Sequence, residues 1–172
     1  MTSLRASSPE VRARMRAQRR RDTAPEMLYR QALFSMGLRY RVDLRIAPLR
    51  RRGDIVFTRW KVVVFVDGCF WHACPMHGTL PKSNQNWWGA KLRANVERDR
   101  ETDRLLSATG WRVVRIWEHE SPPTALSRIL AALNAAGAEI PLVREEHGRN
   151  EILLVRQPGR TVVRRMSHRP SG

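Results

Sequence analysis

The twelve residues from Val66 to His77 contain most of the side chains in this chain that could do chemistry. Cys69 and Cys74 are its only cysteines, and His77 follows three residues after the second. Thiolates and imidazoles at such spacing are typical ligands of a structural Zn²⁺, which takes four. The alternatives are two buried thiols beside surface histidines, or a small disulfide loop, which is rare in the cytosol that we expect for this chain.

Three ligands leave one zinc position to be filled from another part of the chain. His119 is the preferred candidate, because it comes just after a predicted strand that would end beside this loop if it ran parallel to the strand before the loop. His147 is the rival. We assign His72 to proton transfer rather than to zinc, since imidazole titrates near neutral pH and the adjacent Trp71 directs His72 away from Cys69.

Asp54 begins one predicted strand, and the next strand ends at Val66. A carboxylate beside a neighbouring strand end suits Mg²⁺, which takes oxygen ligands and keeps waters for phosphate chemistry. The alternative is an aspartate that caps the turn after Gly53.

Phe70 and Trp71 lie inside the cysteine loop, and Trp87 and Trp88 lie near the start of a predicted helix. Large aromatic side chains on a loop either fold onto the core or are held out. A loop stiffened by zinc could hold them out as wedges between base pairs, at a cost of a few kcal/mol of unstacking per step.

Hydrophobic spacing and turn residues predict the elements that position these side chains. The predicted elements are a helix from about 23 to 36, strands at 39–44, 54–57 and 61–66, a helix at 88–109, a strand at 111–117 and a helix from 121 to 137. The order αβββαβα predicts an α/β fold with a mixed sheet, in which the last two strands pair in parallel across the long helix.

Two helices have predicted core faces. Thr23 and Glu26 fit a capping box at the start of the first helix, where Pro25 suits the first turn. The inward residues of this helix are Leu28, Ala32, Leu33 and Met36. Those of the long helix are Leu92, Val96, Leu105 and Leu106, with the charges at 97–104 facing outward.

The net charge limits the classes of partner. The chain has 172 residues, 42% of them hydrophobic, and its 32 lysines and arginines against 16 acids give a net charge of +16. A GC-rich genome explains part of the excess of arginine over lysine but not the scarcity of acids. A chain this basic typically binds a polyanion, most often nucleic acid, and arginine suits bidentate contacts with phosphate and guanine. No apolar run or leader indicates a membrane partner or secretion.

The two ends of the chain differ from its middle. Residues 1–21 carry seven arginines and one acid, and are either a basic arm that orders on DNA or a solvated, frayed arm. Residues 22–137 form the predicted domain. Residues 138–172 are a basic extension in which 152–155 and 161–163 could pair as a hairpin. Nothing in the sequence indicates an oligomer, so a monomer is expected.

Several motifs together resemble the very-short-patch-repair (Vsr) DNA mismatch endonucleases. The motifs are Asp-Thr-Ala-x-Glu at 22–26, Gly-Asp-Ile-Val at 53–56, Gly-Cys-Phe-Trp-His at 68–72, Asn-Val-Glu-Arg-Asp-Arg at 95–100, Gly-Trp-Arg-Val at 110–113 and Ile-Trp-Glu at 116–118. The resemblance covers roughly residues 10–137. It implies a restriction-endonuclease-like variant of the PD-(D/E)xK nuclease core, with a structural zinc loop and a basic N-terminal arm.

The resemblance also implies an activity. The family nicks double-stranded DNA on the 5′ side of the thymine in T·G mismatches, which arise by deamination of 5-methylcytosine, and so starts short-patch repair. It implies Mg²⁺ and Zn²⁺ as cofactors, other mismatch-repair proteins as partners, and work at the nucleoid of a prokaryotic cytoplasm.

The roles of individual residues follow by resemblance. Asp54 and the backbone carbonyl of Val66 would bind Mg²⁺, His72 would be the general base, Asp99 would orient His72, and Glu26 would hold a water of the metal's hydration shell. The residues that would contact DNA are Phe70, Trp71 and Trp88 as a wedge from the major groove, Met15 from the minor groove, and Lys91 and Asn95 at the mismatched pair.

This chain departs from the family pattern at two places. Val66 and Asp67 stand where some members have Thr-His, so Asp67 could bind a water of the metal and raise the local negative charge. His119 falls where the family often has cysteine, which gives a zinc set of Cys69, Cys74, His77 and His119. The alternative functions are a related endonuclease of this core with a different DNA target, and a zinc-bearing DNA-binding module without activity.

Overall fold

The computed structural model describes residues 22–82, 84–140, 142–147, 150–157 and 160–162, the last three segments by their backbone only. Seven elements form its main body: α2 (Ala24–Ser35), β1 (Arg41–Arg45), β2 (Arg52–Phe57), β3 (Val62–Asp67), α3 (Gln85–Ala108), β4 (Arg112–Trp117) and α4 (Pro122–Ala135). The predicted α/β class and the element order αβββαβα are confirmed.

One mixed sheet organises these elements, with the strand order β1-β2-β3-β4. The first three strands are antiparallel, whereas β3 and β4 are parallel, with Asp67 opposite Trp117. Parallel neighbours need a long crossover connection, and here α3 supplies it. The predicted β-α-β unit is therefore confirmed, and both of its strands end at the same edge of the sheet.

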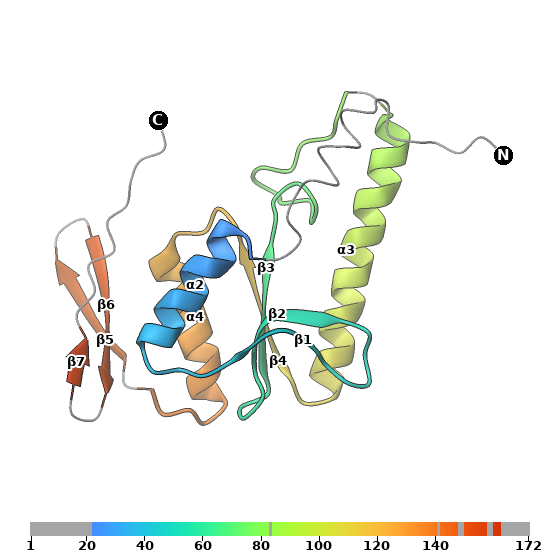
Figure 1. The fold of residues 1–172 in the computed structure, drawn as a ribbon. Helices are drawn as coiled ribbons and strands as arrows, with labels where there is room; N and C mark the ends of the chain where they lie inside the picture. The colour runs from blue at the N-terminus through green and yellow to red at the C-terminus, as the bar shows by residue number, and fades with distance from the viewer. Residues whose placement is uncertain (1–21, 83, 141, 148–149, 158–159, 163–172) are drawn as a thin grey trace.

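Helices cover both faces of the sheet, with α2 and α4 on one side and α3 on the other (Figure 1). Alternate residues of a strand point to opposite faces. Ile55 and Val64 accordingly join the core under α2 and α4, whereas Val56 and Val63 join a smaller core with Leu106 of α3. This burial on both faces explains the unbroken β-branched run of β3.

Helix α2 starts and packs differently from the prediction. Thr23 is the N-cap but accepts no side-chain hydrogen bond, and Glu26 Oε2 accepts from the Asp22 N–H at 3.0 Å instead. Tyr29 is buried in the core, whereas Leu28 is 38% exposed. The prediction for Leu28 was wrong because the helix is rotated so that Tyr29, Ala32 and Leu33 face the sheet.

The inward face of α3 is more polar than predicted. Asn95 and Thr102 are buried along with Leu92 and Leu106, while Val96 and Leu105 are only half-buried. The prediction that all charges at 97–104 face outward was also wrong, since Asp99 and Asp103 pair with Arg115 of β4. One side of α3 therefore lines a polar cleft.

The packed core continues slightly beyond residue 137. Asn134 Oδ1 accepts from the Ile140 N–H at 2.6 Å, and the Ile140 side chain is buried in the main core. Beyond it, a separate antiparallel sheet is formed by β5 (Leu142–His147), β6 (Asn150–Gln157) and β7 (Arg160–Val162). The expected hairpin corresponds to β6 and β7, and β5 is an additional strand.

Residues 1–21, with the predicted arm and Met15, lie outside the described residues. Among the helices that the structure describes, none is both long enough and apolar enough to cross a bilayer.

We expect Leu33→Ala to lower the free energy of unfolding by about 2–5 kcal/mol, because Leu33 is fully buried and its truncation leaves a cavity. Leu28→Ala in the same helix is the matched control, with an expected change below about 1 kcal/mol. Urea denaturation followed by circular dichroism measures both values. Equal losses for the two variants would contradict the described rotation of α2.

Candidate active site and metal centre

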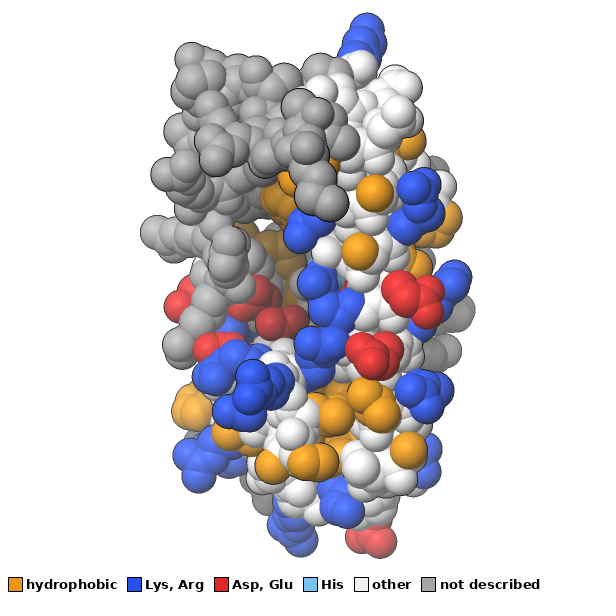
Figure 2. All heavy atoms as spheres, turned by 90° about the vertical axis from the view of Figure 1, so that its right-hand side faces the viewer, with side chains coloured by type: hydrophobic (Ala, Val, Ile, Leu, Met, Phe, Trp, Pro, Cys, Tyr) orange, Lys and Arg blue, Asp and Glu red, His pale blue; other side chains and the backbone are white. Residues whose placement is uncertain are grey.

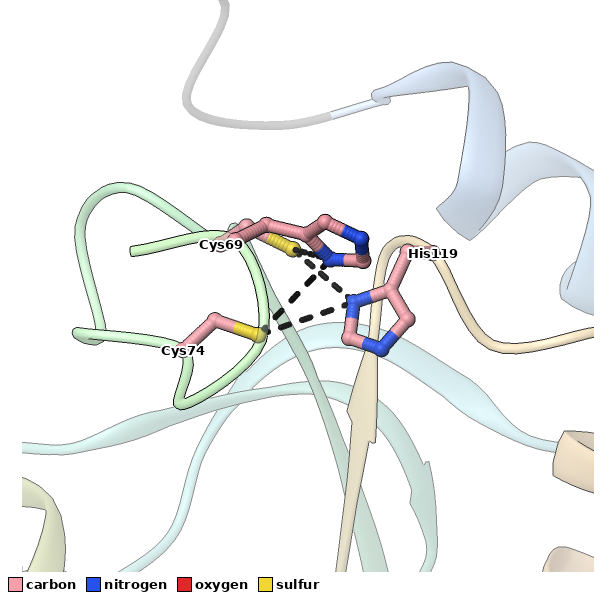
Figure 3. A group of neighbouring side chains, drawn as sticks. Cys69, Cys74 and His119 are labelled. Carbon is pink, nitrogen blue, oxygen red and sulfur yellow. Dashed lines mark hydrogen bonds between the residues drawn. The ribbon is translucent and has the colours of Figure 1, made fainter. Parts of the chain in front are cut away.

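The loop after β3 and the turn after β4 bring four potential metal ligands together. Cys69 and Cys74 come from the loop, and His119 comes from the turn, with their side chains pointing toward one another (Figure 3). With His77 they form a group whose ligand atoms all lie within 4.8 Å of one another. The parallel pairing of β3 and β4 causes this meeting, as the sequence predicted.

The distances in this cluster fit a tetrahedral zinc site. The sulfur-to-nitrogen distances are 3.9 and 3.0 Å from Cys69 Sγ to His77 and His119, and 4.0 and 3.7 Å from Cys74 Sγ to the same two rings. Zinc bonds of about 2.3 Å to sulfur and about 2.0 Å to nitrogen at tetrahedral angles imply about 3.6 Å for such pairs. Two sulfurs and two nitrogens are also a donor set that zinc prefers.

Backbone and side-chain contacts hold the loop in this shape. The Cys69 N–H donates to Glu118 Oε1 at 2.7 Å, which ties the loop to the residue after β4. Burial, and then the neighbouring Cys74, raise the pKa of the Cys69 thiol to about 11. Two thiolates side by side are unfavourable without a cation, so a bound divalent metal would exchange with their protons.

A cavity of about 690 Å³ opens beside the Cys/His cluster, between β2, β3 and α3. Its lining includes the predicted site residues from several elements, namely Glu26, Asp54, Val66, Asp67, Trp71, His72, Lys91, Asn95 and Asp99. Side chains that lie far apart in the sequence thus share one cleft. On the α3 side of the molecule, basic side chains flank a group of acidic ones that is partly recessed (Figure 2).

Asp54 lies on β2 at the floor of the cleft, where its Oδ2 accepts the Val66 N–H at 2.8 Å. Burial raises the pKa of Asp54 to about 6, the Val66 hydrogen bond opposes that rise, and Glu26 and Asp67 add to it. A half-buried carboxylate next to two others is an unfavourable concentration of negative charge. A hard divalent cation such as Mg²⁺ would relieve it.

His72 and Asp99 form a close pair across the cleft, with 2.6 Å between Nδ1 and Oδ2. Burial lowers the pKa of His72, but the Asp99 hydrogen bond and the charge of Asp67 outweigh it, so that the net shift is upward. The pKa of Asp99 is lowered: burial opposes ionisation, and the bonds to His72 and Arg115 overcome it. The expectation that Asp99 lies against His72 agrees with this geometry.

Glu26 is buried near Asp54 and is held by Arg30, whose Nη2 donates to Oε2 at 2.8 Å. The guanidinium also contacts Asp22. Arg30, one helical turn after Glu26, therefore holds the Glu26 carboxylate in place. The sequence analysis expected this carboxylate to bind a water of the Mg²⁺ hydration shell. The sequence analysis did not single out Arg30.

The three aromatic side chains predicted to form a wedge, Phe70, Trp71 and Trp88, differ in their exposure. Phe70 and Trp71 are half-buried, but Trp88 is only 3% exposed. The Trp88 ring lies under both of the others, at centroid distances of 5.2 and 6.2 Å. In this arrangement Trp88 is the support on which Phe70 and Trp71 rest, and its part in a wedge inserted into DNA stays a prediction.

Lys91 and Asn95, the two residues predicted to contact the mismatched pair, also differ in their exposure. Lys91 is exposed at the cleft. Asn95 is 5% exposed, with Nδ2 donating to the Trp71 carbonyl at 2.9 Å and Oδ1 accepting from Arg98. In this structure Asn95 braces the aromatic loop, and its contact with the mismatched base pair stays a prediction.

Comparisons with known proteins agree with these features. A family model for the DNA mismatch endonuclease Vsr matches residues 7–77. The type II nicking enzyme V.NaeI of Lentzea aerocolonigenes is 50% identical over 123 residues, which cover 70% of this chain and 74% of that protein. V.XorIIP, a type II nicking enzyme of Xanthomonas oryzae pv. oryzae, is 41% identical over 116 residues, covering 66% of this chain and 83% of the relative.

The chain belongs to the Vsr family of DNA endonucleases. The DNA mismatch endonuclease Vsr of Escherichia coli is 40% identical over 106 residues, or 60% of this chain and 66% of that protein. The matched segment of the family model includes Asp54, His72 and the cysteines, but ends before Asp99 and His119.

Within this Vsr-family chain, Asp67 is a buried acid with a charged partner. Arg115 Nη1 donates to both of its carboxylate oxygens, at 2.8 and 2.9 Å. The guanidinium offsets part of the negative charge of Asp67, which still contributes to the raised pKa of Asp54. The sequence analysis missed Arg115, although an arginine in a core strand and the aspartates four residues apart at 99 and 103 were a signal.

We expect one zinc ion per chain, because the four ligand atoms match a tetrahedral set. Cys69→Ser and His119→Ala should each reduce the bound zinc well below one equivalent, as measured by elemental analysis after gel filtration. Met76→Ser, an exposed change in the same loop, is the control and should retain the metal. Full zinc content in His119→Ala would show that the fourth ligand is another residue.

We expect Asp54→Asn to stabilise the metal-free protein at pH 8. The pKa of Asp54 is raised from its ordinary value near 4 to about 6, so ionisation weakens the fold progressively as pH rises from about 4 to 6, and the loss is complete above that range. The gain should approach about 3 kcal/mol at pH 8 and vanish below about pH 4, since one pKa unit corresponds to about 1.4 kcal/mol. Urea denaturation of wild type and variant in a chelator, at about pH 4 and at pH 8, measures this gain. An equal difference between the two proteins at both pH values would contradict the prediction.

Proposed function

We propose that this chain nicks double-stranded DNA on the 5′ side of the thymine in a T·G mismatch, by Mg²⁺-dependent hydrolysis, and so initiates very short patch repair. The observation that carries the proposal is that Asp54 and the His72–Asp99 pair line one cavity beside two half-buried aromatic rings. The names of the relatives, nicking enzyme and mismatch endonuclease, support both the reaction and the substrate.

The architecture supports a nuclease of the PD-(D/E)xK type. In the proposed core, Asp54 on β2 and the end of β3 occupy the metal-binding edge of a mixed sheet with helices on both faces. Asp54 and the backbone carbonyl of Val66 would hold Mg²⁺, which when bound supplies charge neutralisation at the scissile phosphate and stabilises the leaving 3′ oxygen.

His72 would take the proton from the attacking water. A carboxylate can only accept hydrogen bonds, so the contact with Asp99 places the proton of neutral His72 on Nδ1 and leaves Nε2 as the base. Once His72 is charged, Asp99 stabilises the imidazolium at 2.6 Å. In other enzymes too, a carboxylate orients a histidine that acts as general base and stabilises its charged form.

Specificity would come from the ease of opening the mismatched site. Phe70 and Trp71 form an edge-to-face pair with centroids 5.1 Å apart, supported from below by buried Trp88. Inserting such rings into DNA requires unstacking, which costs a few kcal/mol per step. A T·G wobble pair is already weakened, so the same insertion is less costly there than at a Watson–Crick pair.

Affinity for DNA would come mainly from charge. The net charge of +16 supplies a sequence-independent attraction that falls steeply with salt. At the cleft itself, Lys91 and Arg98 lie near the acidic floor, where they can meet the phosphates on either side of the cleaved bond.

A nicking assay on otherwise identical T·G and C·G duplexes tests this proposal. With Mg²⁺ we expect a single nick 5′ of the mismatched thymine, and no cleavage of the paired duplex or in EDTA. Asp54→Ala should reduce nicking below detection, whereas Glu139→Gln, which also removes one acid but on an exposed residue away from the cleft, should leave it unchanged.

Equal cleavage of both duplexes would indicate an endonuclease of the same core with another target. DNA binding that survives in Asp54→Ala, together with a wild type that never cleaves, would indicate a binding module instead.

A further inference from the structure

Arg115 on β4 is the most highly connected charged side chain beside the cleft. Nη1 donates to both oxygens of Asp67, and Nε donates to both oxygens of Asp103 at 3.0 Å. Nη2 lies 3.4 Å from both the Asp99 carbonyl and Asp99 Oδ1. The guanidinium also lies over the Phe65 ring, with 4.9 Å from Cζ to the centroid.

An arginine in a nuclease cleft would ordinarily be assigned to a phosphate. Here each of the three guanidinium nitrogens already contacts an aspartate, and the side chain is only 22% exposed. A phosphate could gain Arg115 only by displacing carboxylates that are themselves half-buried or buried. Arg115 is therefore poorly placed to bind DNA directly.

Two of the three aspartates touch the proposed base. His72 Nδ1 lies 2.6 Å from Asp99 and 3.6 Å from Asp67. Without a cation between them, Asp67, Asp99 and Asp103 would repel one another in a poorly solvated place. The guanidinium holds them in one arrangement, and so determines where the two carboxylates beside His72 lie.

We propose that Arg115 is a positioning residue that, through Asp67 and Asp99, fixes the His72 imidazole for proton transfer and does not itself contact DNA. The inference rests on the proposed function, in which His72 accepts the proton of the attacking water. It also accounts for Asp67: a buried acid at this place in the chain needs a permanent cation on the neighbouring strand, and Phe65–Arg115 is a registered pair of β3 and β4.

The first test separates chemistry from DNA binding. Arg115→Met keeps the length of the side chain without its charge, and we expect the single-turnover nicking rate at saturating enzyme to fall about 30-fold or more, since small misplacements of reacting groups cost up to about 100-fold. Arg115→Lys keeps the positive charge but cannot bridge three carboxylates, so its nicking rate should fall by less than that of Arg115→Met. Arg128→Met, whose arginine pairs with Glu120 away from the cleft, is the matched control and should be unchanged.

The salt dependence of binding distinguishes a positioning residue from a phosphate contact. Loss of one phosphate contact reduces the slope of log K against log salt concentration by about 0.9. Measured on the T·G duplex without Mg²⁺ and without a chelator, so that bound zinc is retained, the slope should be unchanged in Arg115→Met and reduced in Lys91→Met. A reduced slope in Arg115→Met would overturn the inference.

A double-mutant cycle tests the route through Asp99. If Arg115 acts through the Asp99–His72 pair, Arg115→Met should slow Asp99→Asn by less than about threefold, because the interaction it supports is already lost. If the two losses instead multiply, Arg115 has an independent structural role and the inference fails. Thermal unfolding of each variant identifies those that do not fold, and Arg115→Lys then replaces Arg115→Met in the cycle.

A crystal structure of the Arg115 variant gives a readout that does not depend on activity. We expect the contact between His72 Nδ1 and Asp99 Oδ2 to lengthen or break, and an unchanged pair would overturn the inference. A wild type that cleaves other DNA, but not T·G duplexes, contradicts the proposed function alone, and the variants are then compared on the DNA that it cleaves.

Discussion

The parallel pairing of β3 with β4 is the constraint on which both sites depend. Parallel neighbours end at the same edge of a sheet, so the loop after Asp67 and the turn after Trp117 must lie side by side. That adjacency brings His119 to the two cysteines, and it ties Glu118 to the backbone of Cys69. The Cys/His cluster and the acidic cleft are therefore two consequences of one strand pairing, joined by the short segment 68–74.

Acidic side chains gather around the cleft although the chain as a whole is strongly basic. A protein with a net charge of +16 places Glu26, Asp54, Asp67 and Asp99 around one cavity. Three of these acids pair with buried or half-buried arginines: Glu26 with Arg30, and Asp67 and Asp99 with Arg115. Asp54 has no such ion pair among the described contacts and has the pKa raised to about 6, so it is the carboxylate best suited to a metal.

The buried Asp67 on β3 is accompanied by Arg115 on the adjacent strand β4. The pair preserves a carboxylate near His72 without leaving an uncompensated buried charge. The aromatic loop likewise relies on buried groups behind it, since Trp88 supports the rings and Asn95 holds the Trp71 carbonyl.

The sequence by itself determined the order of the elements, the parallel crossover, the four candidate zinc ligands and the pairing of His72 with Asp99. These follow from short-range spacing, from turn residues and from motifs that resemble the Vsr family. Only the tertiary structure decided that Tyr29 rather than Leu28 faces the core, that Trp88 and Asn95 are buried supports, and that Arg115 joins three aspartates. The reason is physical: the rotation of a helix against a sheet, and contacts between residues as far apart as Asp67 and Arg115, depend on packing across elements, which local periodicity does not specify.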